Sequence, residues 1–320
     1  MQYRRFGRTG WQVGDVGYGM WGMGGWTGSD DEESLASLQR SVDLGCNFFD
    51  TAYVYGNGRS EHLLGELVRA NSGKRLYTAT KVPPKNMQYP TLPQFSLDDC
   101  YPPEHIEEFL HKSLENAELD RFDLLQLHTW NDDWTDDDSW SNMLESLKRQ
   151  DLIRACGISI NRWEPWNGVK AVRSGKIDSV QVVYNIFDQN PEDALFPACR
   201  EMDVAVIARV PFDEGTLTGT MTKVTTFPAD DWRSNYFSPE NLIQSVERAD
   251  DLRTLIPENS SMPELALRFI LSDPAVSTII PGMRKQRNVD ANMAASDAGV
   301  LDAKLLEKLR EHRWVRKTAP

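Results

Sequence analysis

A regular alternation of short apolar segments with segments of helical periodicity most constrains the fold of this chain. Eight segments rich in β-branched and aromatic residues are predicted strands: Val13–Tyr18, Asn47–Ala52, Leu76–Lys81, Phe122–His128, Ile153–Ile160, Val180–Asn185, Val204–Val210 and Ser277–Pro281. Helices are predicted between them over Glu32–Leu44, Glu61–Arg69, His105–Leu119, Trp140–Arg149, Trp163–Arg173, Ala194–Met202 and Pro263–Leu271. This alternation is typical of a parallel α/β sheet, and eight such units fit a closed (β/α)8 barrel.

The composition shows no break along the chain, which favours a single barrel domain over residues 1–320. A last helical segment, Asp302–Arg313, is expected to pack outside the barrel. The main rival is a doubly wound nucleotide-binding fold, which needs a glycine-rich turn after its first strand. The segment Gly17–Gly28 is rich in glycine, but two tryptophans interrupt it. Because such rings would keep the backbone away from a pyrophosphate, we favour the barrel.

Charge and hydropathy exclude several classes of partner. The chain has 35 Lys and Arg against 48 Asp and Glu, a net charge of −13, with acidic runs at Asp30–Glu33 and Asp132–Asp138. A nucleic-acid-binding protein normally shows the opposite excess, so we expect no nucleic-acid partner. No stretch approaches the ~20 apolar residues of a membrane span, and the N-terminus lacks an apolar signal segment. We therefore expect a cytoplasmic protein without a membrane partner.

The cysteines and histidines indicate neither disulfides nor a metal centre. Cys46, Cys100, Cys156 and Cys199 lie far apart, without a CxxC pair. The five histidines show no spacing typical of metal ligands. We expect free thiols and no metal site.

Three long connections follow predicted strands and so belong to the barrel face on which active sites are built. They are Val82–Pro102, Thr129–Ser139 and Phe212–Pro239, and we expect them to form a substrate rim. Seven tryptophans lie on or near the loops of this face: Trp21, Trp26, Trp130, Trp134, Trp163, Trp166 and Trp232. Flat apolar walls suit sugars, steroids or aromatic aldehydes, whereas the acidic loop Asp132–Asp138 would disfavour anionic substrates.

Four polar residues gather at the ends of three consecutive predicted strands. Period-two alternation places Asp50 inside the barrel, with Lys81 on the neighbouring strand and His128 on the next. Tyr55 follows Asp50 closely enough to fold back over the barrel mouth. Alone, Asp50 could cap a helix, Lys81 could be a solvated strand end and His128 a core imidazole. Together they predict a catalytic site.

Sequence motifs around these residues make the chain resemble the aldo-keto reductases. DTAYVYG, ATKV and LLQLH carry the four residues, and IRACGISIN, VQVVYN, IARVPFDEGTLTG and PGMRKQRNVDAN follow in the family's order. The likeness spans nearly the whole chain. It implies a (β/α)8 TIM barrel with an N-terminal β-hairpin and a C-terminal extra helix.

The resemblance implies that the protein reduces a small-molecule carbonyl compound, or oxidises an alcohol, with a nicotinamide cofactor. Tyr55 would be the general acid, with Lys81 and Asp50 tuning it and His128 orienting the carbonyl. A free tyrosine, with a pKa of about 10, is a poor acid at neutral pH, and a nearby ammonium favours its phenolate. We therefore expect Lys81 to lower the pKa of Tyr55.

The resemblance also implies a set of cofactor-binding residues: Trp21, Ser159, Asn161, Gln181, Arg209, Pro211, Leu217, Gly219, Gly282, Arg284, Asn288 and Asn292. The sequence departs from the family at three of these places. Ile160 separates Ser159 from Asn161, Arg209 replaces a ring-stacking tyrosine, and Asn288 is shorter than the usual Arg or Gln. A guanidinium can stack on a flat ring, but beside a cationic nicotinamide it would disfavour the oxidised cofactor.

A cationic cluster favours NADPH over NADH. Arg284, Lys285 and Arg287 lie where a helix is expected to begin, in a chain of net charge −13. Cations at a helix N-terminus oppose its dipole, unless an anion such as a 2′-phosphate lies between them.

Two alternative functions stay open. A barrel glycosidase would need two carboxylates facing one cleft, but the apparent partner of Asp50 is Lys81. A channel-associated regulatory subunit of the same fold would bind the cofactor and turn over slowly. Substrate, direction and oligomeric state do not follow from the sequence.

Overall fold

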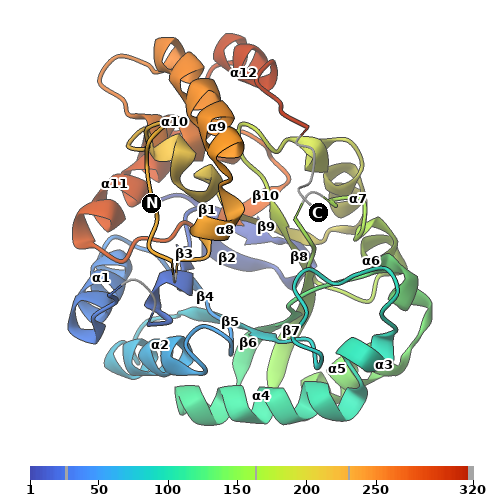
Figure 1. Cartoon of the computed structure of the whole chain (residues 1–320). Helices are drawn as coiled ribbons and strands as arrows, with labels where there is room; N and C mark the ends of the chain where they lie inside the picture. The colour runs from blue at the N-terminus through green and yellow to red at the C-terminus, as the bar shows by residue number, and fades with distance from the viewer. Residues whose placement is uncertain (26–27, 163, 230, 316–320) are drawn as a thin grey trace.

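Eight parallel strands form the central sheet of the computed structural model, which describes residues 1–25, 28–162, 164–229 and 231–315. The strands are β3 (Tyr18–Gly19), β4 (Phe48–Asp50), β5 (Tyr77–Val82), β6 (Phe122–Leu127), β7 (Ile153–Ser159), β8 (Ser179–Val183), β9 (Ala205–Arg209) and β10 (Val276–Ile279). Each pairs in parallel with its neighbour in chain order. Single bridges, Val16 with Ile279 and Gly19 with Gly282, bring the last strand back to the first. The predicted (β/α)8 barrel is therefore confirmed (Figure 1).

The barrel closes over a close approach of two backbones. The amide of Gly17 donates to the carbonyl of Ile279 at 2.8 Å. A Cβ atom at Gly19 would lie only 2.5 Å from the carbonyl oxygen of Ile280, so this position requires glycine. The strand predicted over Val13–Tyr18 was wrong in extent. Val13 and Gly14 pair within the N-terminal hairpin, whereas the barrel strand consists of Tyr18–Gly19, with a single bridge at Val16.

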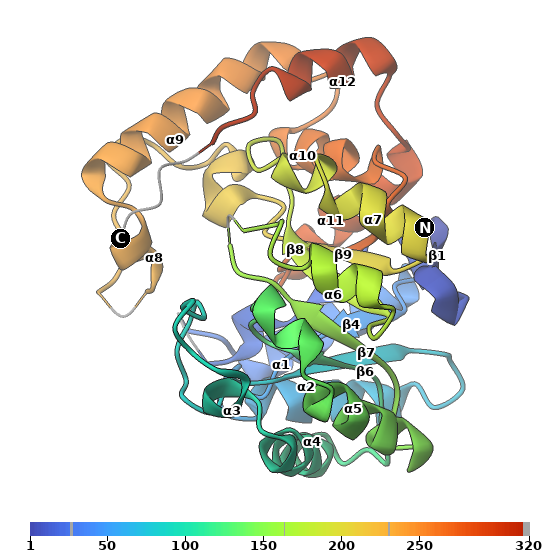
Figure 2. The ribbon, with the colours of Figure 1, turned by 90° about the vertical axis from the view of Figure 1, so that its right-hand side faces the viewer.

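An antiparallel hairpin covers the N-terminal end of the barrel. It consists of β1 (Tyr3–Phe6) and β2 (Trp11–Gly14), joined by the turn η1 (Gly7–Thr9). The ring of Phe6 stacks on Trp11 at 5.5 Å and on Phe48, inside the barrel, at 5.4 Å. Figure 2 shows this hairpin on the side of the barrel opposite to α3 and α8. The loops at the other end are therefore free to build a site.

Helices surround the barrel, as the alternation predicts (Figure 1). The outer helices are α1 (Asp31–Asp43), α2 (Arg59–Ala70), α4 (Pro103–Ala117), α5 (Ser139–Arg149), α6 (Val169–Ser174), α7 (Leu195–Met202), α10 (Met262–Leu271) and α11 (Gln286–Ala298). Additional helices and turns are α3 (Leu97–Cys100), α8 (Arg233–Tyr236), α9 (Pro239–Asp251), α12 (Ala303–Arg310), η2 (Trp21–Met23), η3 (Asp132–Asp136), η4 (Asn190–Glu192), η5 (Asp213–Thr218) and η6 (Leu252–Leu255). The C-terminal helix α12 confirms the predicted extra helix.

The predicted helix over Trp163–Arg173 was wrong at its start, because α6 begins only at Val169. Trp163 itself lies outside the described residues. Side-chain hydrogen bonds to the loop after β6 hold the start of α6 and the residues that lead into it. Asn167 donates to the carbonyl of Trp130 at 2.9 Å, and Asp132 accepts the amide of Lys170 at 2.8 Å.

All four cysteines are buried and free of disulfides. Within the described ranges, no helix combines the length and apolarity that crossing a bilayer requires.

Candidate active site

The inside of the barrel is layered along the strands, with apolar side chains toward the N-terminal ends of the strands and polar side chains toward their C-terminal ends. Phe48 packs in an interior cluster with Tyr77 and Leu124, whereas its neighbour Phe49 packs in the outer core. This confirms the alternation expected for the strand. Further along the strands, positions that share this inner face become polar, as at Asp50, two residues after Phe48. The polar positions lie at the ends of the strands, where the active sites of barrels are built.

Lys81 is the centre of this polar layer. Its Nζ donates to Asp50 Oδ1 at 2.5 Å, to the carbonyl of Thr51 at 2.7 Å and to Tyr55 Oη at 3.4 Å. Lys81 is fully buried and Asp50 is 2% exposed, so the ion pair is shielded from water. The structure thus brings together three of the four residues that the sequence singled out.

Gln126 is a further member of the layer that sequence reasoning missed. Its Nε2 donates to Asp50 Oδ2 at 3.0 Å, and Gln181 Nε2 donates to the same oxygen at 2.9 Å. Gln126 precedes His128 by two residues in LLQLH, so strand alternation was the signal that could have found it. The two amides hold the carboxylate of Asp50 toward Lys81.

The charge state of the pair follows from its surroundings. Burial lowers the pKa of Lys81, but the charge of Asp50 and the phenol of Tyr55 raise it more, so its pKa lies above the usual value. For Tyr55, burial raises the pKa and outweighs the lowering effect of Lys81. Lys81 does act to lower the pKa of Tyr55, as expected. The net pKa of Tyr55 nevertheless lies above the usual value, so the expected net lowering was wrong. Tyr55 is therefore protonated at neutral pH.

His128 lies between two tyrosine rings. Its ring is 5.8 Å from Tyr55 and 5.3 Å from Tyr89, at interplanar angles of 77° and 78°. Burial, with the charges of Lys81 and Arg209, holds the pKa of His128 well below its usual value. The imidazole is neutral at pH 7, and its buried Nδ1 has no hydrogen-bond partner among the described residues.

Arg209 ends β9 beside this group. Its Nη2 donates to the carbonyl of Ile160 at 3.2 Å, while its buried Nε has no partner in the described part of the chain. Burial and the charge of Arg162 lower the pKa of Arg209. Its own charge lowers the pKa of both Tyr55 and His128.

The residues predicted to hold a nicotinamide carboxamide are only partly together. Ser159 and Gln181 are register partners on β7 and β8. Asn161 turns away from them: its Nδ2 donates to the carbonyl of Thr91 at 3.1 Å and to Glu164 Oε2 at 2.9 Å. Both donor hydrogens of its amide are thereby used.

The loop after β9 has an unusual backbone. Val210, Asp213 and Glu214 have positive φ angles of 56°, 47° and 56°. Arg162 spans this loop with ion pairs to Glu214 at 2.5 Å and to Asp213 at 3.2 Å. Of the predicted cofactor residues here, Pro211 and Leu217 are buried, and Gly219 ends η5 with a φ of 71°. Sequence reasoning did not single out Arg162, because its role depends on contacts with a loop about 50 residues away.

The predicted phosphate-binding segment borders an open depression of about 430 Å³. Glu33, Ala36, Lys285, Gln286 and Arg287 line it, between the starts of α1 and α11. No ion pair holds Lys285 or Arg287 within the described chain. Gly282 forms one of the two bridges that close the barrel, and Arg284 lies beside Gly22 of η2, the turn that also contains Trp21. On α11, Asn288 is exposed and Asn292 is buried.

The expected tryptophan walls are only partly present. Trp130 and Trp134 are buried in the core, where both stack edge-on with neighbouring rings. Trp21, Trp166 and Trp232 are exposed, and Trp26 and Trp163 lie outside the described residues. The acidic loop is also largely committed to structure, since Lys170 pairs with Asp136 and Lys176 with Asp138.

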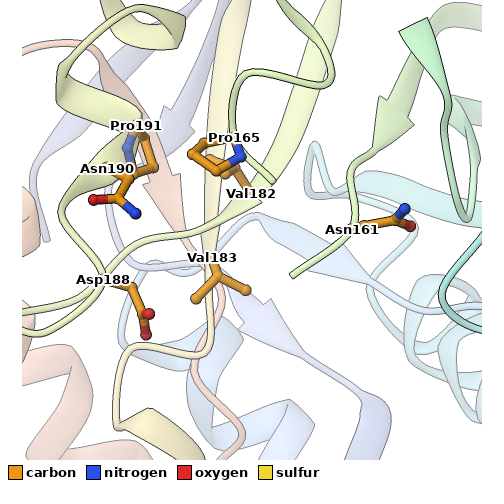
Figure 3. Close-up of a pocket in the computed structure, with 7 residues that line it drawn as sticks. All are labelled: Asn161, Pro165, Val182, Val183, Asp188, Asn190 and Pro191. Carbon is orange, nitrogen blue, oxygen red and sulfur yellow. The ribbon is translucent and has the colours of Figure 1, made fainter. Parts of the chain in front are cut away.

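A small cavity beside β8 is not a substrate site. It measures about 10 Å³, room for about one water molecule, and Val182, Val183 and Asp188 are among its lining residues. Figure 3 shows the side chain of Asn161 standing apart from the other residues that line it. In the part of the chain that the structure describes, no group of His, Cys, Asp or Glu side chains could hold a metal ion.

Comparisons with known proteins agree with this geometry. A model of the aldo/keto reductase family matches residues 15–313. The chain is 28% identical over 302 residues to "Aldo-keto reductase YhdN" of Bacillus subtilis, covering 91% of this chain and 87% of that protein. It is 26% identical over 311 residues to the "NADH-specific methylglyoxal reductase" of Escherichia coli, covering 93% and 94%. The solved glycerol dehydrogenase AKR11B4 of Gluconobacter oxydans superposes with a TM-score of 0.79 at 25% identity, covering 100% and 99%. The protein with this buried Asp50–Lys81 pair beside Tyr55 belongs to the aldo/keto reductase family.

Proposed function

We propose that the protein is an NADPH-dependent oxidoreductase that reduces an aldehyde or ketone, or runs the reverse reaction from an alcohol, with Tyr55 as general acid or base. One observation carries this proposal. The ammonium of Lys81 links Asp50 and the hydroxyl of Tyr55 at the end of the barrel, beside the neutral His128.

The chain's own residues handle the proton in this scheme. When bound, the reduced dinucleotide supplies a hydride to the carbonyl carbon. Tyr55 donates its proton to the carbonyl oxygen, and Lys81 stabilises the phenolate that remains. Asp50, held by Gln126 and Gln181, keeps Lys81 charged within the barrel. The neutral His128 orients the carbonyl oxygen toward Tyr55.

The residues present fit a nicotinamide dinucleotide. Arg209 carries a buried Nε that has no hydrogen-bond partner among the described residues, next to the group that would act on the carbonyl. Lys285 and Arg287 border an open depression and pair with no carboxylate among the described residues. Two such cations suit a phosphate. Arg209 and Ser159 would lie at the nicotinamide, and Lys285 and Arg287 at the 2′-phosphate.

The direct test is turnover. The purified protein is mixed with NADPH and a panel of aldehydes and ketones, and the loss of NADPH absorbance is followed. We expect steady loss with at least one carbonyl compound. No loss with any of them, at protein concentrations that bind NADPH, would refute the proposal in favour of a cofactor-binding subunit without turnover.

The choice between NADPH and NADH should depend on the side-chain charges of Lys285 and Arg287. The double substitution Lys285→Ala/Arg287→Ala is expected to weaken NADPH binding about 100-fold or more, because charged hydrogen bonds contribute roughly 1.5–3 kcal/mol each. NADH binding should stay within about twofold. Both affinities are measured by fluorescence titration, with Lys304→Ala on the exposed face of α12 as the control. Equal losses for the two cofactors would contradict a 2′-phosphate site at this depression.

Arg209 should bias the protein toward the reduced cofactor. Its positive charge would disfavour the cationic ring of NADP+ and leave the neutral ring of NADPH unaffected. In Arg209→Tyr, the ratio of the NADP+ and NADPH dissociation constants is expected to fall several-fold. Titration of both forms against wild type and variant measures the ratio, and an unaltered ratio rejects the idea.

A further inference from the structure

Tyr89 occupies a place at the barrel mouth that the proposed chemistry does not use. It lies on the loop that follows β5, and its ring meets the ring of His128 edge-on at 5.3 Å. On its other side, His128 meets Tyr55 at 5.8 Å. The imidazole therefore separates the phenol that would donate the proton from a second aromatic ring. The side chain of Tyr89 is 40% exposed, so the ring lies where the barrel mouth opens to solvent.

The loop is fixed two residues beyond Tyr89. Thr91 is buried, and its hydroxyl donates to the hydroxyl of Thr129, which directly follows His128, at 2.5 Å. The carbonyl of Thr91 accepts the amide of Asn161 at 3.1 Å. These bonds tie the loop to the segments that follow β6 and β7, so the backbone next to Tyr89 is fixed beside His128 by buried hydrogen bonds.

We propose that Tyr89 limits the size of the carbonyl compound that reaches Tyr55 and His128, and that Asn161 is the positioning residue that holds it there. The inference rests on the proposed carbonyl reduction and adds to it a preference for slender substrates. The ring is a wall immediately beside the imidazole that would orient the carbonyl oxygen. A substituent that extends past His128 on this side meets that wall.

This assignment gives Asn161 a role different from cofactor binding. The side-chain amide of Asn161 donates to the carbonyl of Thr91 and to the carboxylate of Glu164. Asn161 therefore contacts the loop that carries Tyr89. Loss of Asn161 should therefore alter which substrates are accepted and leave the affinity for the dinucleotide within a few-fold.

The experiment compares kcat/KM for naphthaldehyde and for propanal with NADPH in wild type and four variants. Tyr89→Ala removes the wall and is expected to raise the naphthaldehyde-to-propanal ratio about tenfold or more, the low end of what one pocket contact discriminates. Tyr89→Phe keeps the ring and should keep the wild-type ratio. Asn161→Ala should raise the ratio to a smaller extent. Met87→Ala is the matched control, because Met87 lies exposed on the same loop without a ring contact to His128.

Each variant is also checked by circular dichroism and by NADPH titration. An unchanged ratio in Tyr89→Ala, or an equal rise in Met87→Ala, would overturn the size limit while leaving carbonyl reduction in place. A loss of NADPH affinity in Asn161→Ala at constant ratio would assign Asn161 to the cofactor instead. If the wild-type protein turns over no aldehyde at all, the proposed function fails and this inference fails with it.

Discussion

Tyr55→Phe is expected to lower kcat for carbonyl reduction about 100-fold or more, in the range that general acid catalysis contributes. The phenyl ring keeps the edge-on contact with His128 but lacks the hydroxyl that lies 3.4 Å from Lys81 Nζ. His128 does not replace this proton, because its pKa lies well below the usual value and no imidazolium is present near pH 7. Single-turnover and steady-state kinetics with NADPH measure the loss.

Cofactor affinity separates this effect from a general disturbance of the site. NADPH affinity in Tyr55→Phe should stay within a few-fold of wild type, since the substitution removes one oxygen from the carbonyl side. Tyr53→Phe is the matched control, because Tyr53 lies on the same loop and packs edge-on against Phe109 at 4.8 Å. Turnover in Tyr55→Phe close to that of Tyr53→Phe would remove Tyr55 from the role of general acid.

Lys81→Met is expected to abolish turnover and to destabilise the fold by about 3–5 kcal/mol, the usual result of breaking a buried ion pair. Lys81 is fully buried, so its removal leaves the carboxylate of Asp50 charged and unpaired inside the barrel. The midpoint of chemical unfolding and the kcat of the variant measure the two effects together.

A double substitution distinguishes the two roles of the pair. In Asp50→Asn/Lys81→Met no charge is left unpaired, and the asparagine oxygen still accepts from Gln126 and Gln181. Stability should recover by most of the amount lost in Lys81→Met, while activity stays absent. A double variant as unstable as the single one would contradict the account in which an unpaired carboxylate causes the loss.

The fold and the core of the site could be predicted because they depend on short-range patterns. The alternation of strand and helix segments specified the barrel, and period-two alternation placed Phe48 and Asp50 on its inner side. Lys81 followed from the neighbouring strand, since parallel strands end on the same face. The same alternation places Gln126 on the inner side of the barrel, but this residue was missed because its side chain is uncharged.

Other features depend on contacts between loops that are distant in sequence. Trp130 and Trp134 belong to a loop with the composition of a substrate rim, yet they pack in the core. The link between Asn161 and Thr91 joins residues 70 positions apart, and Tyr89, on the loop after β5, contacts the ring of His128, which follows β6. No local periodicity encodes such contacts.

The sequence by itself determined the barrel of eight parallel strands and the polar residues at the ends of those strands, because hydrophobic periodicity and strand alternation are local properties of the chain. Only the tertiary structure decided the net charge state of Tyr55, the partners of Asn161 and the ring beside His128. Burial and loop packing arise from the whole fold: burial of Tyr55 outweighs the nearby ammonium, and the rim loop is fixed by groups that meet only when the barrel closes.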